Sequence, residues 1–252
     1  MSRRRDRLNE IVSYLKRKHA ASIKELAAAF DVSEMTIRRD LSVLKEYNIV
    51  NVIHGAAIYN SDGIYELAAE KDKHAPEKYR IGQKAVSLIE PHDVIVIDIG
   101  TTTEYIAKLL PDDLPVTVVC FTANVLAEIY KKPMVDIIFA GGYYHRDTGL
   151  FESPEGIQLI SRTCANKYFV SAAGISKELG VTCVNQYETS TKLAALKCSL
   201  SKILTVDSTK FGKVKPSYFA DLTDFDAIIT DSGISQDWIE HIQNLGITLH
   251  IV

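Results

Sequence analysis

The sequence predicts a chain of two parts, a small domain of three helices with a β-hairpin and, after it, a larger α/β domain. The first 60 residues contain three stretches of helical apolar spacing, followed by β-branched runs around a glycine. The remaining residues alternate short, continuously apolar runs with helical stretches, a pattern typical of a mainly parallel sheet covered on both faces. We therefore expect a small domain at residues 1–58, a linker at 59–76 and an α/β domain at 77–252.

The composition excludes several classes of protein. With 46% hydrophobic and 24% charged residues over 252 positions, the chain is expected to be an ordinary soluble, cytoplasmic globular protein. No window approaches the roughly 18 uninterrupted apolar residues of a membrane helix, and polar residues interrupt the basic start, so no signal peptide is expected. The four cysteines lack CxxC or metal-ligand spacing, which predicts reduced thiols, no metal and no cofactor: Cys120, Cys164, Cys183 and Cys198.

Charge is distributed unevenly along the chain. Residues 1–60 hold 11 Lys or Arg and 7 Asp or Glu, a net charge of +4. The other residues hold 18 basic and 25 acidic side chains, a net charge of −7. A basic first domain joined to an acidic remainder indicates two tasks, one of which faces a polyanion.

The small domain is expected to contain three helices and a hairpin. Apolar residues at helical spacing predict a first helix over residues 5–18. Ser22 is a suitable N-cap for a second helix, and Ser33 caps a third that runs to about residue 47. A hairpin that turns at Gly55 then completes the pattern of a winged helix-turn-helix.

The third helix carries the residues expected to contact DNA. Ile37, Leu41 and Leu44 lie at i, i+4 and i+7 and face the core, which leaves an exposed side with hydroxyl and guanidinium groups suited to the major groove. Arg38, on the flank, is expected to hold phosphate or Asp40, and Arg3, Arg4 and Arg5 to follow the DNA backbone. With a histidine from the hairpin, the predicted DNA contacts are Ser33, Met35, Thr36, Arg38, Arg39, Ser42 and His54.

These motifs resemble a known family. The run "SEMTIRRDL", preceded by "IKELAAAFDV" and followed by a hairpin that contains "HGA", resembles the DNA-binding signature of the DeoR family of bacterial transcriptional repressors. The resemblance implies a domain that binds double-stranded operator DNA. One departure is visible, because the family's wing usually reads Arg-x-His-Gly-Gly-Ala, whereas residues 52–57 read Val-Ile-His-Gly-Ala-Ala.

The larger domain is expected to alternate strands and helices. Seven apolar runs predict strands at 94–98, 116–120, 135–142, 167–174, 202–207, 226–230 and 247–252. Helical spacing predicts helices at 102–110, 122–132, 153–163, 190–200 and 235–245.

A candidate anion site follows the first of these strands. The strand ends at Asp98, the chain turns at Gly100, and a helix opens with Thr101, Thr102 and Thr103. Free backbone N–H groups and hydroxyls at the positive end of a helix form an anion site. The segment lacks the lysine and the spacing of a nucleotide P-loop.

Other polar residues follow strands at the edge where open α/β sheets bind ligands. They complete the expected effector site with Thr122, Asn124, Gly141, Gly142, Gly174, Asp207 and Lys210. Loop residues His145, Arg146 and Glu188 are weaker candidates.

The larger domain also resembles the effector domain of the DeoR family, so the likeness covers nearly the whole chain. That domain is similar to ribose-5-phosphate isomerase and is expected to bind phosphorylated sugars. The segments "VCFTAN", "SAAGI" and "VDSTKFGKVKP" are similar to those of family members whose inducer is deoxyribose-5-phosphate. We therefore expect a repressor of a sugar or nucleoside catabolism operon. It would act as a dimer or higher homo-oligomer that a small phosphorylated sugar releases from operator DNA.

Two other classes of protein are considered. A sugar-phosphate isomerase with a fused DNA-binding domain needs a carboxylate base beside its substrate. The segment 171–174, which corresponds to the isomerase's Asp-rich segment, holds no carboxylate, so we expect no enzyme activity. A structural DNA-binding protein without an effector leaves the threonine-rich turn unexplained.

Overall fold

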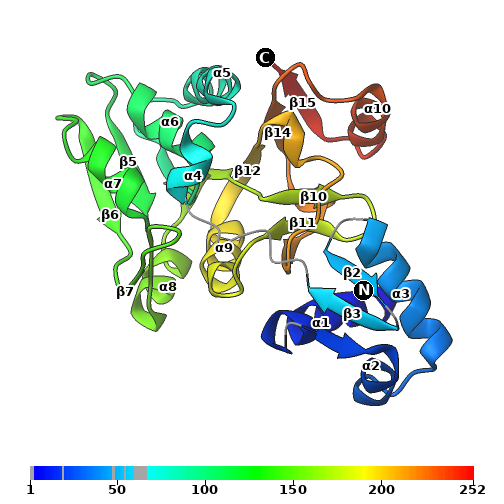
Figure 1. Ribbon diagram of the computed structural model, residues 1–252. Coiled ribbons are helices and arrows are strands. Elements are labelled where there is room, and N and C mark those ends of the chain that lie inside the picture. The colour runs from blue at the N-terminus through cyan, green and yellow to red at the C-terminus, as the bar shows by residue number, and fades with distance from the viewer. Residues whose placement is uncertain (1–2, 19, 47–48, 54, 60–66) are drawn as a thin grey trace.

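The computed structural model describes residues 3–18, 20–46, 49–53, 55–59 and 67–252. The small domain consists of α1 (Arg3–Lys18), β1 (Ala20–Ser22), α2 (Ile23–Ala29), α3 (Glu34–Glu46), β2 (Val50–Ile53) and β3 (Ala56–Tyr59). Its strands form an antiparallel sheet in the order β1-β3-β2, and its helices pack beside that sheet at the lower right of Figure 1. The expected three helices and hairpin are therefore present, with β1 as an additional strand.

Local sequence explains where the helices of the small domain begin. The Ser22 hydroxyl accepts a hydrogen bond from the Glu25 amide at 3.1 Å and caps α2. The Ser33 hydroxyl accepts from the Thr36 amide at 3.2 Å and caps α3 in the same way. Gly55 joins β2 to β3 with a φ of +80°, a conformation that glycine adopts without strain.

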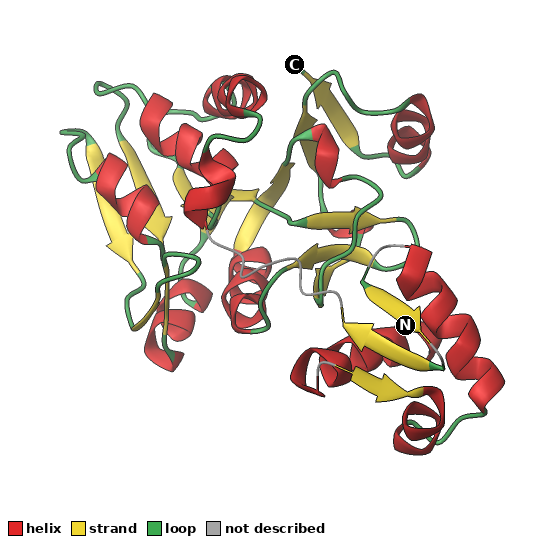
Figure 2. Cartoon of the chain, viewed as in Figure 1, coloured by secondary structure: helices red, strands yellow, loops and turns green. Residues whose placement is uncertain are grey.

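A seven-stranded parallel sheet forms the centre of the larger domain. Figure 2 colours its strands yellow and the helices around them red. Its strands are β4 (Val94–Ile97), β5 (Val116–Cys120), β6 (Val135–Phe139), β9 (Ala165–Val170), β12 (Ser199–Thr205), β14 (Ala227–Thr230) and β15 (Thr248–Ile251), in the order β15-β14-β12-β9-β4-β5-β6. The chain runs outward from β4 to one edge, returns to β9 and then runs to the other edge. The strand order therefore reverses between β4 and β9.

Helices cover both faces of this sheet. Its helices are α5 (Ala75–Val86), α6 (Thr101–Leu109), α7 (Ala123–Ile129), α8 (Pro154–Ser161), α9 (Tyr187–Cys198) and α10 (Gln236–Asn244). In β4, Ile95 and Ile97 pack into a core with α5, α6 and α7, while Val96 packs into the other core with α8, α9 and α10. Burial on both faces explains why these strands are continuously apolar.

A second, antiparallel sheet was not predicted and lies between the parallel sheet and the small domain (Figure 1). It consists of β10 (Gly174–Ser176), β11 (Gly180–Cys183) and β13 (Ser217–Ala220). Leu179 and Val214, beside these strands, pack into the core of the small domain. Lys16 Nζ of α1 also donates a hydrogen bond to the Val184 carbonyl at 3.0 Å. The two domains therefore contact each other through α1 and this sheet.

Several shorter elements differ from the expected pattern. The predicted strand 167–174 is divided, because β9 ends at Val170 and β10 begins at Gly174, in a different sheet. The predicted strand 135–142 ends at Phe139, and the chain continues into a hairpin of β7 (Tyr143–His145) and β8 (Leu150–Glu152). Two short 3₁₀ turns, η1 (Ser208–Lys210) and η2 (Leu222–Asp224), follow β12 and β13.

The segment expected as a linker contains a helix that packs on the larger domain. This helix, α4 (Leu67–Lys71), begins with the Leu67 amide donating to the Asp147 carbonyl at 2.9 Å. It ends with Lys71 Nζ 3.0 Å from Glu104 on α6. None of the described helices has the length and apolarity to span a bilayer.

Candidate functional site

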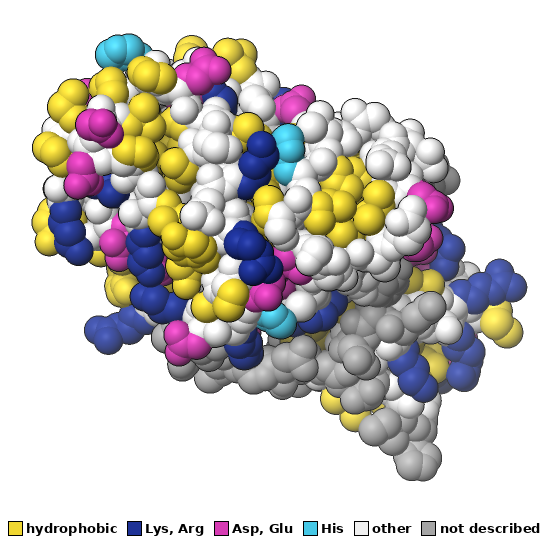
Figure 3. Space-filling model, turned by 90° about the horizontal axis from the view of Figure 1, so that it is seen from above, with side chains coloured by type: hydrophobic (Ala, Val, Ile, Leu, Met, Phe, Trp, Pro, Cys, Tyr) yellow, Lys and Arg dark blue, Asp and Glu magenta, His cyan; other side chains and the backbone are white. Residues whose placement is uncertain are grey.

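The exposed face of α3 carries the predicted DNA contacts. Ile37, Leu41 and Leu44 are buried, as expected, so the opposite face is turned to solvent, where Met35 is 60% exposed. The predicted contacts on or beside this helix are accessible to solvent: Ser33, Met35, Thr36, Arg38, Arg39 and Ser42. Of these, Thr36 is partly buried. Figure 3 shows Lys and Arg side chains gathered at the right-hand end of the molecule, where Figure 1 places the small domain.

Asp40 does not pair with Arg38, in contrast to one of the two roles expected for that arginine. Its carboxylate is buried and accepts hydrogen bonds from Arg7 Nε at 2.6 Å and Arg7 Nη2 at 3.3 Å. Arg4 Nε lies 3.6 Å away. Two arginines of α1 therefore bind the acid on the inner side of α3, and the Arg38 guanidinium lies 4.0 Å from Glu34 instead.

The remaining predicted DNA contacts are only partly described. Arg3, Arg4 and Arg5 lie inside α1 rather than in an extended arm. Arg4 is turned toward Asp40, while the side chains of Arg3 and Arg5 and all of His54 lie outside the described residues.

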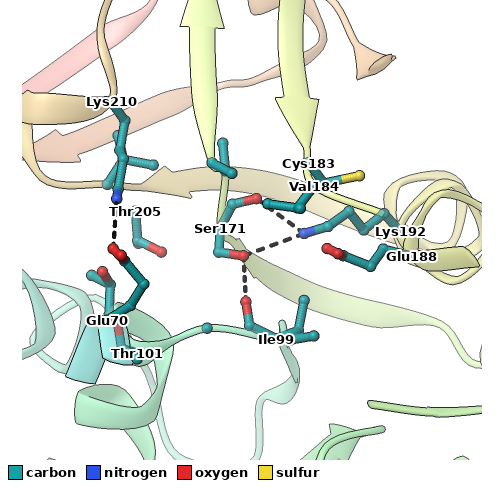
Figure 4. Close-up of a pocket in the computed structure, with 15 residues that line it drawn as sticks. Glu70, Ile99, Thr101, Ser171, Cys183, Val184, Glu188, Lys192, Thr205 and Lys210 are labelled. Atoms are coloured by element: carbon teal, nitrogen blue, oxygen red, sulfur yellow. Dashed lines mark hydrogen bonds and ion pairs between the residues drawn. The ribbon is translucent and has the colours of Figure 1, made fainter. Parts of the chain in front are cut away.

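A pocket opens where the strand order reverses, beside the carboxyl ends of β4, β9 and β12. Open parallel sheets bind ligands at such a switch point. Figure 4 shows that its side chains converge from the β4–α6 turn, the segment after β9, the end of β11 and the turn after it, α9, the end of β12, η1 and α4. The lining residues are Glu70, Ile99, Gly100, Thr101, Thr102, Ser171, Ala172, Ala173, Cys183, Val184, Glu188, Lys192, Thr205, Val206 and Lys210.

The N-terminus of α6 faces this pocket. Gly100 precedes the helix with a φ of +146°, and Thr101 and Thr102 line the cavity. The first hydrogen bond of the helix runs from the Glu104 amide to the Gly100 carbonyl at 3.2 Å, so the preceding amides have no partner within the helix. The Thr103 hydroxyl turns inward and donates to the Asp98 carbonyl at 2.8 Å. Thr103 therefore stabilises the turn and does not line the pocket.

A buried ion pair forms the floor of the pocket. The Lys192 ammonium is 1% exposed and contacts the Asp98 carboxylate. It also donates to the Ser171 carbonyl at 3.1 Å and lies 3.3 Å from the Ser171 hydroxyl. Burial lowers the pKa of Lys192, but the charge of Asp98 outweighs it, and the pKa lies above its ordinary value. The ammonium is therefore protonated, and Asp98 holds it in place.

Glu188 brings a carboxyl group into the same pocket. Its Oε1 atom accepts hydrogen bonds from the Asn185 amide at 3.0 Å and from Asn185 Nδ2 at 3.2 Å. Burial raises the pKa of Glu188 to about 7, although Lys192 opposes the shift. Burial also raises the pKa of the Cys183 thiol beside it, which is therefore neutral. The pocket thus contains a carboxyl group that titrates near neutral pH.

Lys210 lies on the opposite side of the pocket from this ion pair (Figure 4). Its ammonium is 3.6 Å from Glu70 of α4 and 3.9 Å from Asp207. Asp207 does not line the pocket, because its Oδ1 atom accepts the Thr209 amide at 3.1 Å and caps η1. Asp207 therefore fixes the short turn that carries Lys210.

The other predicted effector residues have structural contacts and do not line the pocket. Asn124 Nδ2 donates to the Gly100 carbonyl at 3.3 Å and so supports the turn before α6, while Thr122 is buried at the start of α7. A Cβ atom at Gly142 would lie 2.3 Å from the Glu152 carbonyl oxygen, and one at Gly174 would lie 2.7 Å from that of Lys213. The close approach expected at Gly142 is thus to the protein's own backbone, while a Cβ atom at Gly141 would lie 3.6 Å from the Phe139 ring, an ordinary contact.

Most of the residues that line the pocket were not predicted from the sequence. Glu70, Ser171, Cys183, Lys192 and Thr205 line it but were not predicted. Glu70 lies in the segment interpreted as a linker, and Lys192 has the spacing of an ordinary helical lysine. Lys192, Glu188 and Thr191 of α9 are all buried, which their local sequence does not indicate. Within the described part of the chain, no cluster of three His, Cys, Asp or Glu residues is placed to hold a metal ion.

Comparison with protein families accounts for both parts of the chain. Residues 73–232 match the DeoR C-terminal sensor domain, and residues 7–62 match the DeoR-like helix-turn-helix domain. The chain belongs to the DeoR family. It is therefore a member of a family of DNA-binding transcriptional regulators, with a DNA-binding domain at its start and a sensor domain after it.

Several curated relatives match nearly the full length of the chain. The deoxyribose operon repressor of Escherichia coli (strain K12) is 32% identical over 251 residues, covering 98% of each chain. The lactose phosphotransferase system repressor of Staphylococcus epidermidis is 32% identical over 90% of this chain and 92% of its own. The L-fucose operon activator of Haemophilus influenzae is 32% identical over 89% and 90%. The ribose 5-phosphate isomerase of Plasmodium falciparum superposes with a TM-score of 0.39 at 13% identity, over 54% of this chain and 52% of that one.

Proposed function

We propose that the protein is a transcriptional repressor of a sugar or nucleoside catabolism operon and that a phosphorylated sugar similar to deoxyribose-5-phosphate releases it from its operator. The pocket at the reversal of strand order carries this proposal. It combines the N-terminus of α6 with two lysines, Lys192 and Lys210, which suits an anionic, hydroxyl-rich ligand. The E. coli relative is named for the deoxyribose operon, which supports the same class of ligand.

The polar groups of the pocket suggest how the ligand is oriented. The phosphate binds the free amides at Thr101 and Thr102 together with Lys210, on the side where positive charge is accessible. The sugar hydroxyls then face Ser171, Glu188 and Lys192 on the opposite side. Such a ligand has hydrogen-bond partners at both ends, which favours a pentose phosphate over a free sugar or inorganic phosphate.

Operator binding is assigned to the exposed face of α3. Arg39 and its neighbours enter the major groove, and two copies of the chain place two such helices on a palindromic site. A dimer or higher homo-oligomer is therefore part of the proposal.

The contact between the domains offers a route from the pocket to the DNA. Val184 lines the pocket, and its carbonyl accepts the hydrogen bond from Lys16 of α1 at 3.0 Å. A ligand that shifts the β11–α9 turn therefore alters the support of the DNA-binding domain. By linkage, such a ligand weakens operator binding by as much as operator DNA weakens ligand binding.

An isomerase activity is a second candidate because of one observation. The absence of a carboxylate in residues 171–174 argued against enolisation, but the fold brings Glu70 and Glu188 to the pocket from other elements. Glu188, whose pKa is about 7, is suited to act as a general base. We retain the regulator as the proposal, because the chain belongs to a family of DNA-binding regulators.

A gel-shift titration on the DNA upstream of the protein's own gene tests the proposal. The protein is expected to retard this DNA, and deoxyribose-5-phosphate is expected to release it at concentrations where deoxyribose and inorganic phosphate do not. Retardation that no pentose or hexose phosphate changes would refute the effector part. Turnover of a pentose phosphate by the purified protein would instead favour the isomerase.

A further inference from the structure

Glu70 occupies the part of the pocket where the proposed function places the phosphate. Its carboxylate lies 3.6 Å from Lys210 Nζ. Figure 4 shows this carboxylate turned toward Lys210, with Thr101 at the N-terminus of α6 beside it. A negative group of the protein therefore already lies between the positive groups that an external anion would bind.

The lysines around Glu70 outnumber the carboxylates near it. Lys73 Nζ is 2.7 Å from its carboxylate. Lys78, 2% exposed, donates from Nζ to the Glu70 backbone carbonyl at 2.5 Å. With Lys210, three ammonium groups stand near two carboxylates, those of Glu70 and Asp207. Burial raises the pKa of Glu70, but Lys73 and Lys210 outweigh it and lower the pKa, so the carboxylate is ionised.

Glu70 lies on the helix that leads from the DNA-binding domain. The wing strand β3 ends at Tyr59, and α4 begins at Leu67, eight positions later in the chain. Four contacts among the described residues hold α4 on the larger domain: the Leu67 amide on Asp147, Lys71 on Glu104, the Glu70 carboxylate in the pocket, and the Glu70 backbone carbonyl on Lys78. The third is the contact that an anionic ligand would replace.

We propose that Glu70 is a built-in occupant of the phosphate subsite, which the phosphate of the effector displaces. This inference rests on the proposed function, since it concerns the regulation of the same site. A phosphate dianion at Lys210 and the N-terminus of α6 repels the Glu70 carboxylate, because like charges at a few ångströms destabilise each other. The carboxylate leaves, α4 loses its contact with the pocket, and the segment leading to the DNA-binding domain is released from the sensor domain.

Replacing Glu70 with glutamine tests the displacement, because the side chain keeps its size and loses its charge. Isothermal titration with deoxyribose-5-phosphate should show binding about three- to fivefold tighter to Glu70→Gln than to wild type, the range expected for loss of one partly exposed ion pair. Glu77→Gln is the matched control, because Glu77 on α5 pairs only with Arg80, at 3.7 Å, among the contacts described. Its affinity should equal that of wild type. Equal or weaker binding to Glu70→Gln would overturn the proposal.

Hydrogen exchange at α4 gives a second readout, independent of affinity. Saturating deoxyribose-5-phosphate should speed exchange of the Leu67 amide, which donates to Asp147. Unchanged or slower exchange there would also overturn the displacement. If wild type binds neither deoxyribose-5-phosphate nor ribose-5-phosphate, the proposed effector site fails and the displacement fails with it. If wild type binds them but Glu70→Gln shows no gain, only the displacement fails.

Discussion

Replacing Glu188 with glutamine should stabilise the larger domain at pH 8 much more than at pH 5. Burial raises the pKa of the Glu188 carboxyl from 4.5 to about 7 in the folded protein. Between these two values the folded protein keeps a proton that the unfolded chain has released. The stability of the wild type therefore falls as pH rises across this window, because loss of the proton stabilises the unfolded chain and not the folded protein.

The magnitude follows from the size of the pKa shift. A change of one pKa unit corresponds to about 1.4 kcal/mol, so the full effect is about 3 kcal/mol, of which about 2.5 kcal/mol falls between pH 5 and pH 8. The glutamine variant has no proton to lose at this position. The difference in the free energy of unfolding between variant and wild type should therefore grow by that amount over the same range.

Urea unfolding followed by tryptophan fluorescence measures this difference. Trp238, the single tryptophan, lies on α10, is buried in the core and reports on the larger domain. If the difference in the free energy of unfolding between variant and wild type stays constant or decreases from pH 5 to pH 8, the reasoning is refuted.

Glu104→Gln supplies a control of opposite sign. Burial raises the pKa of Glu104, but Lys108, Asn124 and Lys71 outweigh it, and the pKa lies below its ordinary value. The stability that Glu104 contributes is therefore present above the pKa of the unfolded chain and lost as pH falls through the lower pKa of the folded protein. The wild type should be more stable to urea than this variant from pH 5 to pH 8, and it should lose that advantage as pH falls below the ordinary value of 4.5.

Three further substitutions separate the parts of the molecule. Arg39→Ala, on the exposed face of α3, should weaken operator binding about 10- to 100-fold in a gel shift. The affinity for deoxyribose-5-phosphate should not change. An unchanged operator affinity would show that Arg39 is not part of the interface. Thr102→Ala should leave operator retardation intact but weaken release by deoxyribose-5-phosphate; equal damage to both would contradict the division into two domains. Lys192→Met leaves the Asp98 carboxylate buried without its counter-charge, so urea unfolding should show a loss of about 3–5 kcal/mol, and a loss below about 1 kcal/mol would contradict the role of the ion pair.

The elements that could be predicted from the sequence are those in which burial determines the spacing of apolar residues. The strands of the parallel sheet are apolar on both faces, and α3 has an apolar stripe opposite an exposed face, so both were recognisable. The strands β10, β11 and β13 have three or four residues each, and β13 pairs with a distant segment, as Ala220 does with Val181 of β11. Local sequence does not encode such pairing, and this sheet was missed.

The part of the pocket that could be predicted consists of residues that come directly after a strand in the sequence. The turn at Gly100 with Thr101 and Thr102 is a local signal, because a strand, a glycine and a helix N-terminus occur in sequence. Lys192 is 94 positions from Asp98 and reaches it only because α9 packs over the ends of β4 and β9. Glu70 lies on α4, which precedes β4 in the chain, and its segment has the composition of a linker. Side chains of this kind become recognisable only when the fold is known.

α1 connects the sensor domain to the third helix of the DNA-binding domain. This helix is held at Lys16 by the Val184 carbonyl beside the pocket and at Arg7 by the buried Asp40 of α3. Nine residues of helix separate the two points, a length of about 14 Å. A helix of this length is stiff, so a tilt of about 5° at one end displaces the other by about 1 Å, which is sufficient to break a hydrogen bond of ordinary length. In the proposed function, α1 is a stiff link, so that a movement of the β11–α9 turn would shift Arg7 and, through it, Asp40 on α3.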